Sequence, residues 1–169
     1  MNILVVDGYN IIGAWDELAY LKRKEISLAR DRLLEMLMEY QAFSGDRVII
    51  VFDALYVKGQ ESKMAINNVE VIYTKENETA DECIERLVKS LKNVKNQVYV
   101  ATSDYLEQRT IFSRGALRIS ARELLIEING MESNINDQLI QHSKAQPKLK
   151  ISMEENVLKK FEKWRRGNL

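Results

Sequence analysis

The chain opens with the ten residues MNILVVDGYN (1–10), and the predicted arrangement of the other segments follows from them. Ile3–Val6 is an unbroken aliphatic run, which is typical of a strand buried on both faces. The run ends abruptly on Asp7 and Gly8, and parallel sheets carry their functional groups outside the carboxyl ends of the strands. We therefore predict a central strand that delivers Asp7 to a site. An Asp-Gly pair also favours a simple turn, and this stretch alone does not separate the two interpretations.

Length and composition indicate a soluble globular protein. A chain of 169 residues suits one domain, so we predict a single domain over 1–169, in which 131–169 form a C-terminal connection and a basic amphipathic helix. No basic N-terminal segment precedes an apolar core, and no apolar run reaches the length of a membrane span. We expect a cytoplasmic protein without membrane contact. Cys83 is the single cysteine, and we interpret it as a packing residue.

The net charge of zero hides an asymmetry between the two halves of the chain. Residues 1–85 carry 9 Lys/Arg and 16 Asp/Glu, a net charge of −7, whereas residues 86–169 carry 16 and 9, a net charge of +7. This pattern is compatible with a protein that collects carboxylates at one site and binds a polyanion nearby. A chance distribution on a solvated surface can produce the same split.

Three further acids occupy positions related to that of Asp7. The apolar run from Arg47 ends on Asp53, and the strand-like run 97–101 leads through Thr102 and Ser103 to Asp104. The segment 79–82, Thr-Ala-Asp-Glu, is a capping box that places Asp81 in the first turn of a helix. Helix capping and the helix dipole explain Asp104 and Asp81 structurally, so each acid has an explanation other than chemistry.

Hydrophobic periodicity predicts the order βαββαβαβα, which indicates a three-layer α/β fold around a central, mostly parallel, five-stranded sheet. The expected strands are 3–7, 47–53, 69–73, 97–101 and 116–119, and the expected helices are 26–43, one from 80, one from Tyr105 that Asp104 could cap, one from 121 to Gly130, and one from 152. We expect loops at 8–25 and 54–68, and an irregular or partly helical connection over 131–151.

Four carboxylates at one sheet edge would repel one another unless a cation lies between them. Oxygen ligands without sulfur or a local histidine favour Mg²⁺ or Mn²⁺, and such an ion suits phosphoryl chemistry. We interpret His142, the only histidine, as a solvated side chain. The sequence lacks the GxxxxGK motif of nucleotide hydrolysis, the GxSxG motif of serine-ester hydrolysis and the GxGxxG motif of dinucleotide binding, so we expect no organic cofactor.

The four acidic segments resemble, in this order, those of the NYN domain, which belongs to the PIN-like group of metal-dependent ribonucleases. They are Val6-Asp7-Gly8-Tyr9-Asn10, Phe52-Asp53-Ala54, Thr79-Ala80-Asp81 and Thr102-Ser103-Asp104. The C-terminal extension resembles the YacP-like branch. The resemblance implies Asp7 and Asp104 on adjacent central strands and endonucleolytic cleavage of RNA. For the YacP-like branch it implies cleavage of messenger RNA on translating ribosomes.

The resemblance also implies roles for single residues in a catalytic set of Asp7, Asn10, Asp53, Asp81 and Asp104. Asp7, Asp81 and Asp104 would hold Mg²⁺, Asn10 would orient Asp7 or a metal-bound water, and Ser103 would be a supporting donor. Asp53 would bind metal or stabilise the loop that follows it. Many members of the PIN-like group have an acid on the first helix. In this chain that helix carries Arg30, Asp31 and Glu35, and none of them clearly matches the acid, so the resemblance does not decide whether a second metal ion is bound.

RNA contacts have weaker support in the sequence. Candidate phosphate-binding cations are Arg109, Arg114, Arg118, Arg122 and the cluster Lys159 to Arg166, which includes Lys160 and Arg165. For that cluster, cations complementing the dipole of their own helix are an equally good explanation. Tyr9, Trp15 and Tyr56 lie near predicted strand ends and are candidates for stacking on unpaired bases.

The leading hypothesis is therefore a Mg²⁺-dependent endoribonuclease with RNA and the ribosome as partners. The alternative is a catalytically weak RNA- or ribosome-binding module of the same fold, in which the acids are caps and turns. A phosphotransfer fold of the aspartyl-phosphate type would need a second acid two residues beyond Asp7, where the chain has Tyr9.

Overall fold

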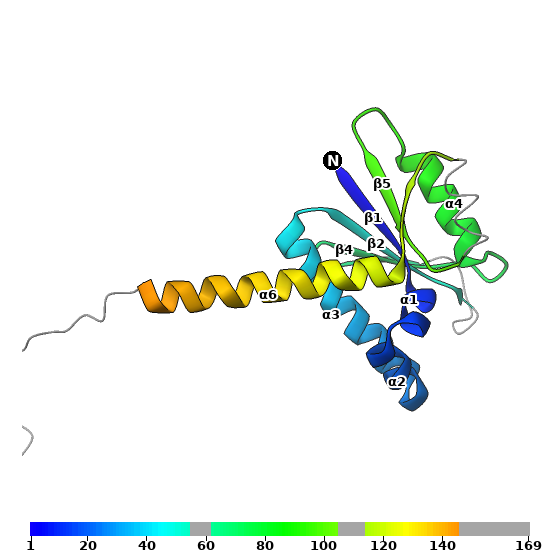
Figure 1. The fold of residues 1–169 in the computed structure, drawn as a ribbon. Helices are drawn as coiled ribbons and strands as arrows, with labels where there is room; N and C mark the ends of the chain where they lie inside the picture. The colour runs from blue at the N-terminus through cyan, green and yellow to red at the C-terminus, as the bar shows by residue number, and fades with distance from the viewer. Residues whose placement is uncertain (55–61, 105–113, 146–169) are drawn as a thin grey trace, which may run out of the picture. The chain divides into compact units, whose positions relative to one another are not determined.

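A computed structural model describes residues 1–54, 62–104 and 114–145. The chain divides into two compact units, Met1–Ser133 and Asn134–Leu169, and the prediction of a single domain over 1–169 stays a prediction. The first unit holds a six-stranded sheet with the strand order β3-β4-β2-β1-β5-β6 (Figure 1). The strands are β1 (Asn2–Asp7), β2 (Arg47–Phe52), β3 (Ser62–Ile66), β4 (Val69–Tyr73), β5 (Gln97–Ala101) and β6 (Leu117–Ile119).

β1 lies in the middle of the sheet and pairs in parallel with β2 on one side and β5 on the other. Val5 lies opposite Ile49 of β2 and Val100 of β5. β4 and β6 extend the parallel sheet, and β3 alone is antiparallel, at the edge. The carboxyl ends of five strands therefore share one edge, and Asp7 and Asp104 follow adjacent central strands, as the resemblance implied.

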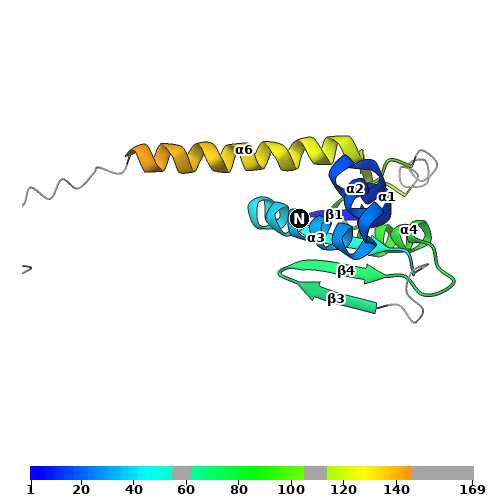
Figure 2. The same cartoon turned by 90° about the horizontal axis from the view of Figure 1, so that it is seen from below.

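Helices cover both faces of the sheet because alternate residues of the buried strands point to opposite sides. Leu4 and Val6 pack in a cluster with α1, α2, α3 and the beginning of α6, whereas Ile3 and Val5 pack against α4 (Figures 1 and 2). The helices are α1 (Gly8–Ala14), α2 (Asp16–Lys24), α3 (Ile26–Ser44), α4 (Ala80–Leu91) and α6 (Ala121–Ala145). The predicted three-layer α/β fold is confirmed, and the buried Cys83 on α4 is a packing residue. Within the described ranges, no helix has the length and apolar character that a membrane crossing requires.

The sheet has six strands rather than five because β3 lies inside the segment predicted as a loop over 54–68. Four of the five residues of β3 are exposed, so the strand lacks the apolar run that identified its neighbours. The turn to β4 is Asn67-Asn68, and both residues have positive φ angles, 46° and 66°. Two asparagines that accept this conformation between two strands are a hairpin signal, and this signal identifies the strand that the hydrophobic pattern misses.

Two further predictions about helices are wrong. Residues 8–25, predicted as a loop, form the short helices α1 and α2, and two glycines in α1 weaken its helical pattern. Gly130 does not end the helix from 121, because α6 continues to Ala145. A glycine ends a helix when it adopts a positive φ, as Gly45 does after α3 at 72°, and Gly130 is not among the glycines with a positive φ. The described part of the second unit, 134–145, is the continuation of α6, and His142 on it is exposed, as expected.

Trp15, a candidate for stacking on RNA bases, is instead a core residue. Its side chain is 3% exposed, and the indole Nε1–H donates a hydrogen bond to the carbonyl oxygen of Ala121 at 2.7 Å. The ring lies at the junction of α1 and α2 and ties that junction to the first residue of α6. The base-stacking assignment is therefore wrong, because a buried ring with a bonded N–H has no face to offer to RNA.

Replacing Trp15 by Phe is expected to lower the free energy of unfolding by about 1–3 kcal/mol, because the buried hydrogen bond from the indole N–H to the carbonyl of Ala121 is lost. Urea denaturation followed by circular dichroism measures this loss. Tyr20→Phe on the surface of α2 is the control and should change stability by less than about 0.5 kcal/mol. Equal stability of the two variants would contradict the structural role of Trp15.

Candidate active site at the carboxyl edge of the sheet

Asp7 lies at the point where β1 becomes α1. The residue is 8% exposed, and its Oδ1 accepts a hydrogen bond from the backbone N–H of Asn10 at 3.5 Å, so Asp7 also caps α1. The side chain of Asn10 makes a second connection, in which its Oδ1 accepts the backbone N–H of Ser103 at 2.8 Å. This bond joins the ends of β1 and β5, which are 93 residues apart in sequence. The structure therefore brings Asp7, Asn10 and Ser103 together, although the donor is the backbone of Ser103.

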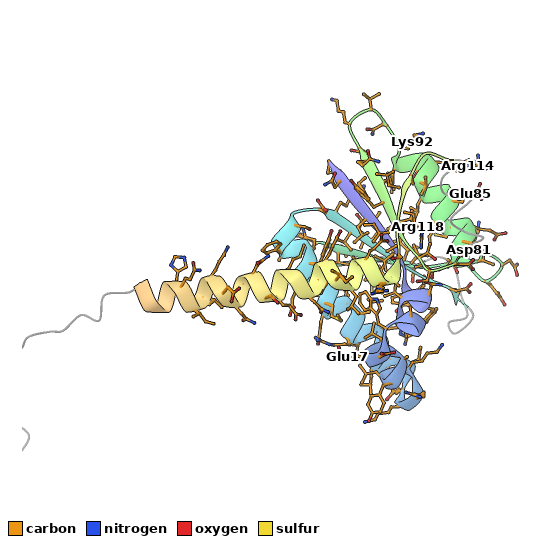
Figure 3. All side chains as sticks on the ribbon, viewed as in Figure 1. Glu17, Asp81, Glu85, Lys92, Arg114 and Arg118 are labelled. Carbon is orange, nitrogen blue, oxygen red and sulfur yellow. The ribbon has the colours of Figure 1, made fainter. Side chains whose placement is uncertain are left out.

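Asp53 follows β2 and positions the beginning of α4. Its Oδ2 accepts the backbone N–H of Ala80 at 3.3 Å, and Asp81 is the next residue, exposed in the first helical turn (Figure 3). The predicted capping box is confirmed: Thr79 Oγ1 accepts the N–H of Glu82, and the Glu82 carboxylate accepts the N–H of Thr79. This geometry gives Asp53 a structural role, because its carboxylate fixes the turn that carries Asp81.

Asp104 lies three residues beyond β5 in a segment anchored by Thr102. Thr102 is fully buried, and its Oγ1 accepts the backbone N–H of Asp104 at 3.1 Å. The N–H of Thr102 donates to the carbonyl of Ile119 at the end of β6. Asp104 itself is exposed at the carboxyl edge. The proposed helix that Asp104 would cap lies outside the described residues.

Two buried polar residues that the sequence reading did not select brace the connections around Asp53 and Asp81. Thr74 Oγ1 accepts the backbone N–H of Ala54 at 2.9 Å, directly after Asp53. Glu78 accepts two hydrogen bonds from the guanidinium of Arg86, at 3.0 and 3.1 Å, and its side chain is 6% exposed. Their only sequence signal is that both are polar residues shortly before a capping box, which also fits a solvated loop. Together these contacts fix the segment between β4 and α4.

Aromatic rings pack beside the acids, and their position explains why residue 8 is a glycine. The ring of Phe52 lies between those of Tyr9 and Tyr73, with centroid distances of 5.0 and 5.5 Å. A Cβ atom built on Gly8 would lie 2.3 Å from Cε1 of Phe52, so only glycine lets the backbone after Asp7 pass so close to this ring. The hydroxyl of Tyr9 accepts a hydrogen bond from Nη1 of Arg30 at 3.1 Å. Base stacking by the half-buried Tyr9 stays a prediction.

The proposed metal ligands are not gathered into a closed set. Within 1–54, 62–104 and 114–145, no three Asp, Glu, His or Cys side chains form a group that could hold a metal ion. The ligand chemistry at the edge is nevertheless all-oxygen, which suits Mg²⁺. Mg²⁺ keeps several waters and is usually held by one or two carboxylates together with substrate phosphates, so a three-acid cage is not required. The set Asp7, Asp81 and Asp104 stays a prediction.

The remaining predicted RNA contacts fall into two groups. Arg114 and Arg118 are exposed near the end of the first unit, and Arg114 forms an ion pair with Glu85 of α4 (Figure 3). Arg122 on α6 is also exposed. Tyr56, Arg109, Lys160 and Arg165 lie outside the described residues, as does the predicted helix from 152. Their roles stay predictions.

A cavity of about 200 Å³ lies at the opposite edge of the sheet, beside Asn2, Tyr40, Asp46 and Glu127. Burial and then the nearby carboxylate of Asp46 raise the pKa of Tyr40 to about 12. Asn2 begins β1 and Asp46 directly precedes β2, so the cavity reaches the amino ends of these two strands. It is separate from the edge that carries Asp7.

Replacing Asn10 by Ala should reduce the RNA cleavage that the resemblance implies about tenfold or more, because the backbone N–H of Ser103 loses its acceptor and the ends of β1 and β5 separate. Asn10→Asp keeps an oxygen acceptor at the same position and should retain more activity than Asn10→Ala. Single-turnover cleavage rates measure both variants. Identical rates for Asn10→Ala and the wild-type chain would show that this bond does not organise the site.

Comparisons with known proteins agree with this geometry. The family model of the YacP-like NYN domain matches residues 4–166. An uncharacterized protein YacP of Bacillus subtilis is 54% identical over 169 residues, which cover 100% of this chain and 99% of the relative. Two crystal structures of Rae1 (YacP) from Bacillus subtilis are also similar. One has 54% identity and a TM-score of 0.75, and it covers 100% of this chain and 97% of the other. The W164L mutant has 49% identity and a TM-score of 0.76, with 99% and 97% covered. The chain with the acidic edge around Asp7 therefore belongs to the YacP-like NYN domain family, which has a PIN-like nuclease fold.

Proposed function

We propose that the chain is a Mg²⁺-dependent endoribonuclease that cleaves messenger RNA in association with the translating ribosome. Membership of the YacP-like NYN domain family supports a nuclease that acts on RNA. The observation that carries the proposal is the bond between Asn10 and Ser103, because it joins the acid-bearing ends of β1 and β5 at one edge. Caps and turns alone would not require a contact between segments so far apart in sequence.

The residues of this edge would have different roles in phosphodiester hydrolysis. Asp7, Asp81 and Asp104 would hold Mg²⁺ together with water and phosphate oxygens of the RNA, and the bound ion would supply an activated water and a counter-charge. Asn10 keeps the carboxylate of Asp7 in register with the segment that carries Asp104. Asp53 fixes the first turn of α4, and with it Asp81. The low exposure of Asp7 strengthens its attraction to a cation, because less water screens the charges.

Charge supports the ribosome as a partner. The net charge of zero gives the chain little general attraction for RNA, and residues 1–85, which carry three of the four candidate acids, have a net charge of −7. A ribosome would present the messenger RNA at high local concentration, so the protein would need little affinity of its own for the RNA. This proposal places the protein in the cytoplasm.

Incubation of messenger RNA with the purified protein, with and without ribosomes, tests this partner. We expect cleavage with translating ribosomes and little cleavage of the same RNA alone. The Asp7→Asn protein is the matched control, since it lacks one carboxylate and should retain the fold, because the amide oxygen can still accept the N–H of Asn10. Equal cleavage rates with and without ribosomes would contradict the ribosomal part of the proposal and leave the nuclease part standing.

A binding module without strong catalysis is the second candidate, and the lack of a three-ligand group among the described side chains favours it. Isothermal titration with Mg²⁺ and Mn²⁺ separates the two candidates. The nuclease should bind one of these ions in the presence of a non-cleavable RNA, and Asp81→Asn should weaken that binding. RNA or ribosome binding without any metal binding or cleavage would favour the module.

A further inference from the structure

Arg30 occupies an unusual position beside the acids of the carboxyl edge. The residue lies on α3 and is half-buried, and its Nη1 donates to the hydroxyl of Tyr9 at 3.1 Å. Its guanidinium carbon lies 6.0 Å from the centre of the Tyr73 ring. We propose that Arg30, which the Tyr9 hydroxyl holds in position, binds a backbone phosphate of the RNA next to the site of cleavage, a role that rests on the proposed ribonuclease function.

The partners of Arg30 differ from those of other arginines. Arg32 forms an ion pair with Glu17, Arg47 with Glu70, and Arg86 with Glu78. In the described part of the chain, no carboxylate forms an ion pair with Arg30, and the Tyr9 hydroxyl is the acceptor for its guanidinium. A guanidinium has five N–H donors in a planar fork that matches the oxygens of a phosphate. Arg30 therefore has donors and charge left for an external anion.

The charge of Arg30 is maintained despite its partial burial. Burial lowers the pKa of the guanidinium, but the hydrogen bond to Tyr9 and the neighbouring Tyr73 and Asp31 favour the charged form more, so the net pKa shift is upward. The Tyr9 hydroxyl accepts a hydrogen bond from Arg30 and so holds the guanidinium in position. A phosphate oxygen beside the guanidinium would receive hydrogen bonds from its other N–H groups.

The sequence neighbours of these groups connect them to the proposed active site. Tyr9 lies between Asp7 and Asn10 in the turn after β1. Tyr73 ends β4, directly before Thr74, whose hydroxyl holds the backbone beyond Asp53. Both tyrosines pack against Phe52, which is 2% exposed and cannot move easily. The cation is therefore held by the same turns that carry the acids, and it offsets their repulsion of the RNA backbone.

The salt dependence of RNA binding tests this proposal. Each phosphate contact on a single strand contributes about 0.7 to the slope of log K against log salt concentration. The measurement uses the full chain with Asp7→Asn to prevent cleavage, and a labelled single-stranded RNA without divalent ions. Arg30→Gln should lower the slope by about 0.7, whereas Arg30→Lys, which keeps the charge, should retain it.

Arg32→Gln, two positions along the same helix, is the matched control and should leave the slope unchanged, because Glu17 already pairs with Arg32. Tyr9→Phe keeps the charge of Arg30 but removes the hydroxyl that holds its guanidinium, and it should weaken binding by about threefold or more without changing the slope. An unchanged slope for Arg30→Gln, or no RNA binding by the parent, would overturn the phosphate site. Failure of the nuclease function is a separate result, since it appears as the absence of cleavage by the wild-type chain.

Discussion

The Asp7→Asn protein is expected to cleave RNA at least about 100-fold more slowly than the wild-type chain, a loss of about 2.7 kcal/mol of transition-state stabilisation. The substitution removes the negative charge that would hold the metal ion. It leaves Oδ1 available as an acceptor for the N–H of Asn10, so the cap of α1 survives. Initial rates of cleavage with translating ribosomes measure the loss, and the midpoint of thermal unfolding should stay close to that of the wild-type chain.

Substitutions of two other aspartates serve as controls, because they distinguish a loss of catalysis from a general effect of removing a negative charge. Asp46→Asn changes an aspartate just before β2, at the opposite edge of the sheet, and should leave the cleavage rate unchanged. Asp16→Asn removes an exposed acid from the first turn of α2, and Asp81 likewise lies in the first turn of α4. If Asp81 acts only on the helix dipole, Asp16→Asn and Asp81→Asn should have equal effects. We expect cleavage to fall for Asp81→Asn alone.

Gly8→Ala is expected to lower the free energy of unfolding by about 1–3 kcal/mol, the usual cost of overpacking a core. The new methyl group would lie 2.3 Å from Phe52 Cε1, and neither side can move easily, because the Phe52 ring is packed between Tyr9 and Tyr73. Displacement of the turn would also move Asp7 and Asn10, so RNA cleavage should fall together with stability. Urea denaturation and cleavage rates measure the two effects.

Gly13→Ala in the same helix is the control for the loss of a glycine. A Cβ atom at Gly13 meets nothing within 4 Å, and alanine in a helix is more stable than glycine by roughly 0.5–1 kcal/mol. Gly13→Ala should therefore stabilise the protein and leave cleavage intact. If Gly8→Ala and Gly13→Ala changed stability equally, the close approach of Gly8 to Phe52 would not explain why residue 8 is a glycine.

The sequence predicts the central strands because they are buried on both faces and read as unbroken apolar runs. β1 and β2 have this form, and their final positions place Asp7 and Asp53 at the correct edge. β3 escapes detection because an edge strand with exposed residues has no such run. The continuation of α6 past Gly130 depends on a glycine that costs only about 1 kcal/mol in a helix, which local signals cannot distinguish from a stop.

The acids of the candidate site are predictable because strand ends and capping boxes are local features. Their connections are not, since the bond from Asn10 to Ser103 spans 93 residues and depends on the strand order. Trp15 illustrates the same limit, because a tryptophan near a strand end suits base stacking until tertiary packing places it under α6. The role proposed for Arg30 is not predictable from the sequence either, because its contacts with Tyr9 and Tyr73 depend on tertiary packing.

Mapping the new 5′ ends in a messenger RNA during translation by purified ribosomes tests the proposed endonuclease most directly. With the wild-type chain we predict 5′ ends inside the message, and with Asp7→Asn we predict that these ends disappear. The same internal ends with both proteins would show that the acid-bearing edge does not catalyse the cut. A message that stays intact with the wild-type chain, whether translated or not, would contradict the endoribonuclease itself.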